Sequence, residues 1–172
     1  MGLLGGSIGG SPIQEHSAYV ATDLYAASGN LETLGSPHPY INQDGLLYLR
    51  LNEAQVAPWS FTGVRAKQTP LFLAQRSKIQ VLIFNQQETI DLLKAPPRTE
   101  KVMFYFPLLI MQGDTPFLGD SQLVNFIEAW KGQFLPIYNA SIHLLVDGPL
   151  QIPNRVPLIY INRDHIQGYL KA

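Results

Sequence analysis

Two parts of the chain repeat the same order of hydrophobic and polar positions. The segment that starts at Tyr48, YLRLNEAQV, matches the segment that starts at Phe134, FLPIYNASI, at an offset of 86 residues. Further on, PLFLAQRSKIQVLIF from Pro70 matches PLIYINRDHIQGYLK from Pro157 at an offset of 87 residues. Two shorter matches precede these in the same order. Four ordered matches predict an internal duplication.

The repeat predicts how the chain is divided. We expect two copies of one unit at residues 18–84 and 102–172, after a flexible glycine-rich tail at residues 1–17. Residues 85–101 are expected to form a linker with one short helix, because capping-box spacing opens it and a proline pair ends it.

Alternation of apolar and polar residues indicates β-strands in each unit. Leu49 and Leu51 alternate with polar residues, and the apolar positions then change parity at Ala54. The second unit shows the same change. Because strand side chains alternate with period two, this predicts a bulge or bend at Asn52-Glu53 and at Tyr138-Asn139.

Gly, Pro and polar clusters predict where the strands end or bend. Triplets centred on Gly29 and Gly113 are expected to form turns. Pro107, inside an apolar run, predicts an edge position or a bulge. Polar tetrads that begin at Gln75 and Asn162 have the composition of tight turns.

A helix is expected around residues 120–130, where Leu123, Ile127 and Trp130 have helical spacing. The equivalent stretch of the first unit contains Pro37 and Pro39, which predict a shorter helix or none.

The last apolar run of each unit is hydrophobic at consecutive positions, which predicts a strand that is buried on both faces or lies in a closed barrel. With the alternating strand before it, this run supplies the expected core: Leu49, Leu51, Leu71, Leu73, Ile79, Leu135, Ile137, Leu158, Tyr160 and Ile166.

Composition narrows the class of protein. The chain has 172 residues, of which 46% are hydrophobic and 15% charged, with a net charge of −1 and no cysteine. Disulfides, thiol catalysis and thiolate metal sites are therefore excluded, and near-neutral charge argues against a nucleic-acid wrap. The chain has neither a basic start with an unbroken apolar segment nor a run of 18 apolar residues, so we expect a cytoplasmic protein without a membrane span.

The second half of each unit resembles the Sm-like small barrels. In that family an apolar strand is followed by a tight Ile-Arg-Gly type turn and an isoleucine that opens the last strand. Ile161-Asn162-Arg163-Asp164-His165-Ile166 and Ala74-Gln75-Arg76-Ser77-Lys78-Ile79 resemble this motif, but they lack the glycine and place the arginine one position later. The resemblance implies a mainly β fold of two tandem Sm-like or SH3-like barrel units with short helices, and it implies rings that bind RNA in the pore.

The repeated turns hold the first candidate site. Arg76 and Arg163 occupy equivalent positions, with Lys78 and His165 two places on. An arginine fork suits phosphate, so one interpretation is a pair of phosphate-binding turns. The alternative, which near-zero net charge favours, is a solvated turn whose arginine pairs with a nearby acid or carbonyl.

Aromatic residues form the second candidate site. Trp59, Phe61 and Trp130 are candidates for partner-binding anchors. The alternative is that they cap the end of a barrel. The spacing of the histidines indicates no metal site, and the sequence indicates no catalytic residue and no cofactor.

Three functions remain open. We expect a non-enzymatic interaction or scaffolding module, with an Sm-like nucleic-acid-binding protein as the alternative and an enzyme with a site between the repeats as the third. Edge strands that pair within the chain would leave two outer edges free, so a homo-oligomer is expected, with an edge strand or the helix around Leu123–Trp130 at the contact. A protein partner is compatible with this interpretation.

Overall fold

A computed structural model describes residues 12–85, 98–116 and 122–172. The N-terminal half contains strands β1 (Ile13–Ala21), β2 (Tyr25–Leu34), β3 (Tyr48–Pro58), β4 (Lys67–Gln75) and β5 (Val81–Phe84). The C-terminal half contains β6 (Thr99–Tyr105), β7 (Leu109–Pro116), β8 (Phe134–Leu144), β9 (Arg155–Asn162) and β10 (Gly168–Lys171). Helix α1 (Pro37–Ile41) lies between β2 and β3, and helix α3 (Leu123–Ala129) lies between β7 and β8.

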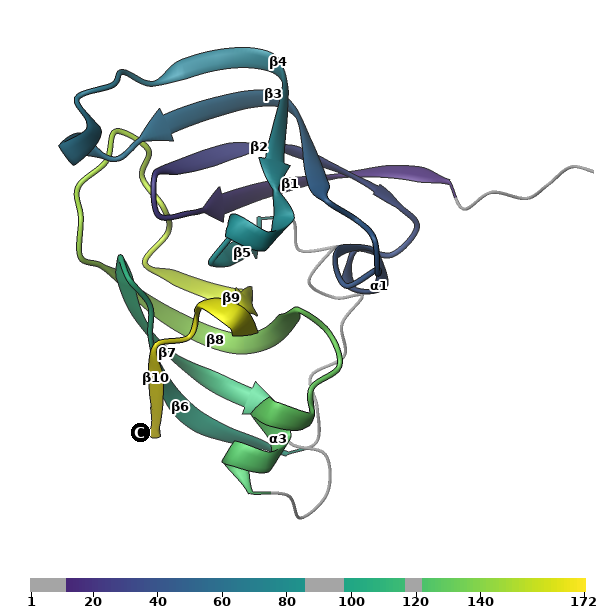
Figure 1. Ribbon diagram of the computed structural model, residues 1–172, viewed down its shortest axis with the longest axis vertical. Helices are drawn as coiled ribbons and strands as arrows, with labels where there is room; N and C mark the ends of the chain where they lie inside the picture. The colour runs from purple at the N-terminus through teal and green to yellow at the C-terminus, as the bar shows by residue number, and fades with distance from the viewer. Residues whose placement is uncertain (1–11, 86–97, 117–121) are drawn as a thin grey trace, which may run out of the picture.

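The ten described strands form one open antiparallel sheet in the order β10-β6-β7-β8-β9-β5-β1-β2-β3-β4 (Figure 1). The fold is therefore mainly β, as expected, but its strands form one continuous sheet rather than closed barrels. In each half the strand order is fifth, first, second, third, fourth. Strands β4 and β10 are the two outer edges.

The halves meet where β5 pairs with β9, in the register Val81↔Ile161, Leu82↔Tyr160 and Ile83↔Ile159. We call this pairing the joint. Alternate side chains of both strands enter two different hydrophobic clusters, because neighbouring residues of a strand point to opposite faces. Val81 and Ile83 belong to one cluster, and Leu82 belongs to the other. Burial on both faces explains why these strands are apolar at consecutive positions.

The predicted bulges are present. The pairing of β2 with β3 shifts between Ser28 and Asn30, and Glu53 there has a positive φ of 48°. The pairing of β7 with β8 shifts in the same way, and Asn139 also has a φ of 48°.

Two glycines and one proline lie in other places than the sequence predicts. Gly29 and Gly113 lie inside β2 and β7 rather than in turns, because each faces the bulge of the next strand, where a side chain would collide with it. Pro107 lies in the connection between β6 and β7, not inside a strand. The apolar run around Pro107 therefore contains two strands joined by a tight turn. Because the turn is also apolar, the sequence pattern resembles that of one continuous strand.

The polar tetrads contain single 3₁₀ turns, at Arg76–Lys78 and Arg163–His165. Helix α3 is present, and α1 is shorter, as expected from its prolines. The expected linker helix lies outside the described residues. Strand β1 begins at Ile13, inside the expected tail, and β6 begins at Thr99, inside the expected linker. Among the described helices, none combines the length and apolar character needed to cross a membrane.

Most of the expected core is buried. Leu49, Leu51 and Ile79 are fully buried in the first half, as are Leu135, Ile137, Leu158 and Tyr160 in the second. Ile166 is half-buried. Leu71 and Leu73 contradict the prediction, because both lie exposed on the edge strand β4.

Candidate functional site

The outer edge of β4 carries hydrophobic side chains that no described part of the chain covers. Leu71 is 41% exposed and Leu73 is 50% exposed. On its other side β4 pairs with β3, in a register that includes Arg50↔Leu73 and Asn52↔Leu71. This edge therefore combines strand backbone groups without a strand partner and two exposed leucines.

Strand β9 shows what this edge looks like when it is covered. The register of β9 on β8 includes Pro136↔Tyr160 and Tyr138↔Leu158, which makes Tyr160 the equivalent of Leu73 and Leu158 the equivalent of Leu71. Leu158 and Tyr160 have no exposed surface. Leu158 and Tyr160 are covered because they pack in the hydrophobic cluster of the N-terminal half, which meets β9 through its pairing with β5, whereas Leu71 and Leu73 belong to neither cluster.

The opposite edge, on β10, also has no partner among the described strands. Strand β10 pairs with β6 as β5 pairs with β1. Leu170 of β10 is 47% exposed, whereas its equivalent in β5, Ile83, is buried at the joint. At Gly168, a Cβ atom would meet no other atom within 4 Å, so space is open beside this end of the strand.

The two turn arginines bind backbone carbonyls. Arg76 donates from Nη1 to the carbonyl oxygens of Ile41 (3.0 Å) and Gln43 (2.8 Å), at the end of α1. Arg163 donates from Nη1 to the carbonyl oxygens of Trp130 and Glu128, at the end of α3. Each arginine thus satisfies carbonyls that the end of a helix leaves without partners. This is the alternative to phosphate binding considered for these turns.

The neighbouring turn residues differ from each other. His165 donates from Nε2 to the carbonyl oxygen of Ser77 (2.6 Å), so it links the turn of the second half to that of the first. Lys78, its equivalent, is exposed in the turn between β4 and β5. The structure therefore brings the two turns into contact through His165 and Ser77, while Arg76 and Arg163 are each directed at carbonyls of a helix end.

The three aromatic candidates lie in different surroundings. Trp59 is 1% exposed and donates from Nε1 to the carbonyl oxygen of Thr22 (3.0 Å), so it is a core residue and not an exposed anchor. It lies against Gly148 of the C-terminal half. Phe61 is 62% exposed. Trp130 is half-buried, and its Nε1 donates to the carbonyl oxygen of Phe134 (3.1 Å).

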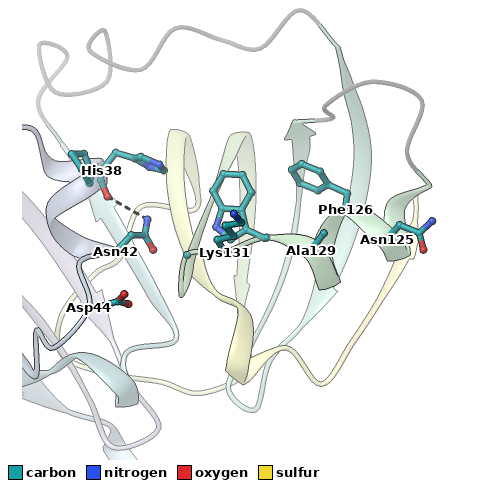
Figure 2. A pocket seen from close by; sticks show the side chains of 10 residues that line it. His38, Asn42, Asp44, Asn125, Phe126, Ala129 and Lys131 are labelled. Atoms are coloured by element: carbon teal, nitrogen blue, oxygen red, sulfur yellow. Dashed lines mark hydrogen bonds between the residues drawn. The ribbon is translucent and has the colours of Figure 1, made fainter.

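A pocket of about 730 Å³ lies between α1 and α3. His38 extends into it from the α1 side, and Phe126 and Ala129 face it from α3 (Figure 2). Asn42 fixes the α1 side to the C-terminal half, because its Oδ1 accepts from the backbone nitrogen of Phe134 (2.7 Å). Sequence patterns did not indicate this pocket, since its two walls are far apart in the chain.

The lining of the pocket combines aromatic and polar side chains with a partly buried imidazole. Nδ1 of His38 is buried and has no hydrogen-bond partner among the described residues. Burial lowers the pKa of His38, which favours the neutral imidazole at pH 7. The described lining contains no serine, threonine or cysteine. It can accommodate a small molecule with apolar groups against Phe126 and polar groups near Asp44 or Lys131.

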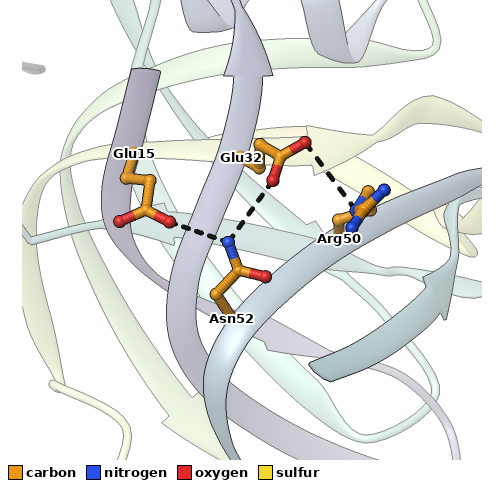
Figure 3. A network of polar contacts seen from close by, with 4 residues as sticks. All are labelled: Glu15, Glu32, Arg50 and Asn52. Atoms are coloured by element: carbon orange, nitrogen blue, oxygen red, sulfur yellow. Dashed lines mark hydrogen bonds and ion pairs between the residues drawn. The ribbon is translucent and has the colours of Figure 1, made fainter. Parts of the chain in front are cut away.

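A polar network crosses strands β1, β2 and β3 (Figure 3). Glu15 and Glu32 lie directly opposite each other, and Asn52 donates from Nδ2 to both carboxylates, at 2.7 and 3.4 Å. Arg50 approaches Glu32 at 3.7 Å. The amide and the guanidinium offset the repulsion between two opposed carboxylates, so the network is explained by the stability of the sheet.

Among the described residues, no three histidine, aspartate or glutamate side chains gather as a metal site would require. Comparison with protein-family models, with curated proteins and with solved structures finds no match for this chain. The outer edge of β4 is therefore our principal candidate site, on its geometry alone.

Proposed function

We propose that the chain is a non-enzymatic interaction module whose outer edge on β4 binds an extended protein segment. The observation that carries this proposal is the exposure of Leu71 and Leu73, whose equivalents Leu158 and Tyr160 are completely buried where β9 meets β5 and the rest of the N-terminal half. An extended segment on this edge would pair with the open backbone groups and place its own side chains beside the leucines. Strand addition of this kind is a common mode of protein recognition.

The finer fold belongs to the same proposal. We regard each half as an opened Sm-like or SH3-like unit, and the two halves as products of a duplication. The shared strand order and the shared bulges at Glu53 and Asn139 support this interpretation. Under it, the two outer edges are the surfaces through which the module associates, as a homo-oligomer.

Nucleic-acid binding is an alternative function that has less support from the structure. The guanidinium groups of Arg76 and Arg163 are already directed at backbone carbonyls, and the net charge is −1. Phosphate binding would require these groups to leave positions in which they stabilise the ends of two helices.

Titration of a labelled peptide tests the proposal. A peptide with the sequence of residues 79–85, which contains β5, carries a fluorophore and a solubilising lysine tail. We expect saturable binding in fluorescence anisotropy, because β5 covers the equivalent edge of β9. Hydrogen exchange of the backbone amides from Leu71 to Ala74 should slow when the peptide binds.

Two variants serve as the test and the control. Leu71→Lys/Leu73→Lys should weaken peptide binding at least ~10-fold, since it removes two apolar contacts at the edge. Leu145→Lys changes an exposed leucine away from both edges and should leave binding unchanged. Equal affinity in all three proteins, or protection of amides elsewhere, would exclude β4 as the binding site.

A further inference from the structure

We infer that the segment bound at the outer edge of β4 is strand β10 of a second copy of this chain. This inference rests on the proposed function and names its partner. The joint within the chain already shows the contact: the fifth strand of one half lies on the fourth strand of the other. The two outer edges of the sheet are the remaining fifth strand and the remaining fourth strand. Each chain therefore has one free fourth strand, β4, and one free fifth strand, β10, which are the two kinds of strand that pair at the joint.

The internal pairings define which positions are equivalent. Leu49 faces Ala74 in β3 and β4, as Leu135 faces Ile161 in β8 and β9. Ala74 is therefore the equivalent of Ile161. By the same comparison of β1–β5 with β6–β10, Gly168 is the equivalent of Val81.

These equivalences predict the register between two chains. At the joint, Val81 faces Ile161 and the next two pairs follow antiparallel. Between copies, Gly168 should therefore face Ala74, Tyr169 should face Leu73, and Leu170 should face Phe72. Leu73 and Leu170, each about half exposed in a single chain, would then lie on opposite faces of the joined sheet, each beside an aromatic residue of the other copy.

The turns beside the joint add charge complementarity. Within the chain, His165 donates to the carbonyl oxygen of Ser77. The equivalent of His165 at the outer edge of the first half is Lys78, and the equivalent of Ser77 in the second half is Asp164. The same geometry between copies therefore directs the ammonium group of Lys78 at the backbone carbonyl of Asp164, a residue whose side chain carries the opposite charge, so the substituted pair is suited to attract.

The side-chain amide of Asn162 at the joint also has an equivalent on β4. Asn162 donates from its backbone nitrogen to the carbonyl oxygen of Gln80 and from Nδ2 to that of Ile79, each at 2.8 Å. Gln75 occupies the matching position on β4 and keeps the amide. The charge at the end of β10 is neutralised within its own chain, because Lys171 lies 3.0 Å from Glu100.

The contact joins different surfaces of two identical chains. Each added copy therefore presents a new free edge, and association continues until a ring closes or a filament grows. This property separates the inferred contact from a symmetric pairing of β4 with β4, which would stop at a dimer.

Two variants, each with one altered edge, test the inference by light scattering at high micromolar concentration. Leu71→Lys/Leu73→Lys alters β4, and Gly168→Lys/Leu170→Lys alters β10 at two positions with free space or exposed side chains. We expect wild-type assemblies larger than a dimer, and a monomer of 19.2 kDa for each variant alone. An equimolar mixture should form a heterodimer, because one intact β4 meets one intact β10. Leu145→Lys should assemble like the wild type.

A charge exchange supplies a test with milder changes. Lys78→Glu and Asp164→Lys should each weaken association, because each places like charges together at the contact. The double variant should restore it, since every contact again joins opposite charges. Circular dichroism spectra like that of the wild type would show that each variant is folded.

The outcomes separate the two proposals. A wild-type chain that stays monomeric overturns the inference, and the peptide titration then still tests the proposed function by itself. Association that persists when β10 is altered indicates that β4 pairs with itself, and also overturns it. Association that persists when β4 is altered places the contact elsewhere and counts against both.

Discussion

At the scale of single residues, the two bulges depend on an unusual backbone conformation. Glu53 and Asn139 both have a φ of 48°, in the left-handed region that a side chain normally avoids. Each bulge faces a glycine of the neighbouring strand. A Cβ atom on Gly29 would lie 2.9 Å from the carbonyl oxygen of Asn52, so the bulged strand can approach only because this side chain is absent.

Glutamate is the less suitable of the two bulge residues, and replacing it should stabilise the protein. Asparagine adopts left-handed backbone more readily than glutamate. We expect Glu53→Asn to raise the free energy of unfolding by about 0.5–1 kcal/mol, within the cost of strain for a residue in this region. Urea unfolding measures it. The reverse exchange, Asn139→Glu, should lower stability, partly because Asn139 also donates to Asp114 (2.9 Å). A less stable Glu53→Asn protein would contradict this account.

At the scale of elements, each short helix is fastened to the sheet by the arginine of a distant turn. Arg76 reaches the end of α1, and Arg163 reaches the end of α3. Helices of five and seven residues have little stability of their own. Their carbonyl groups need partners, and an always-charged guanidinium with several donors provides them.

Removal of either arginine should therefore destabilise the fold. We expect Arg76→Gln and Arg163→Gln each to lower the free energy of unfolding by about 1–3 kcal/mol, because each removes charge-assisted hydrogen bonds to carbonyls. Arg65→Gln, at an exposed loop position, is the matched control and should change it by less than about 0.5 kcal/mol. Unchanged unfolding together with a loss of oligonucleotide binding would favour the phosphate-binding interpretation.

Local patterns predicted elements better than they predicted the connections between them. The bulge at Asn52-Glu53 followed from a change in apolar parity, which is a property of one strand. The short α1 followed from its prolines. The hairpin at Pro107 was missed because its connection is apolar, so that two strands and their turn looked like one run. The local sequence around Gly29 predicts a turn. It does not show that β3 must approach this glycine closely, because β3 is a neighbour in space and not in the sequence.

At the scale of the whole molecule, the joint gives the two halves a common core. Strand β5 contributes Val81 and Ile83 to the cluster that also contains most of the buried residues of the C-terminal half. Trp59, from the N-terminal half, packs in that same cluster. The backbone nitrogen of Ser60 also donates to the carbonyl oxygen of Asp147 (2.9 Å). Neither half can lose its structure without exposing part of the other.

We therefore expect one cooperative unfolding transition. Fluorescence of Trp59, in a Trp130→Phe background, and far-ultraviolet circular dichroism should give coincident midpoints in urea. Ile83→Ala and Ile159→Ala, on facing positions of the joint, should each cost about 2–4 kcal/mol and keep the transition single. Two separate transitions would show that the halves are independent domains. Dilute protein keeps association from adding to the measured stability.

The candidate site shows where prediction from sequence ended. Leu71 and Leu73 have the same pattern as Leu158 and Tyr160, so the sequence alone assigned all four to the core. What separates them is that β9, paired with β5, packs Leu158 and Tyr160 into the cluster of the N-terminal half, whereas no described strand pairs with the outer edge of β4. The expectation that two outer edges would remain free was sound, but it did not identify which apolar strand would be left uncovered. The pocket between α1 and α3 depends on the same placement of one half against the other.

The pairing of β5 with β9 also affects how the chain folds while the ribosome is making it. Strand β5 is complete about 70 residues before β9 begins. At the usual pace of a ribosome, the first half waits about 4–14 s before its own covering strand emerges. During this interval the apolar strand VLIF is open to any neighbouring nascent chain on the same message. Because all copies carry the same β9, the β5 strand of one chain can pair with the β9 strand of a neighbouring chain in the native register. Translation of several chains close together should therefore produce intertwined dimers.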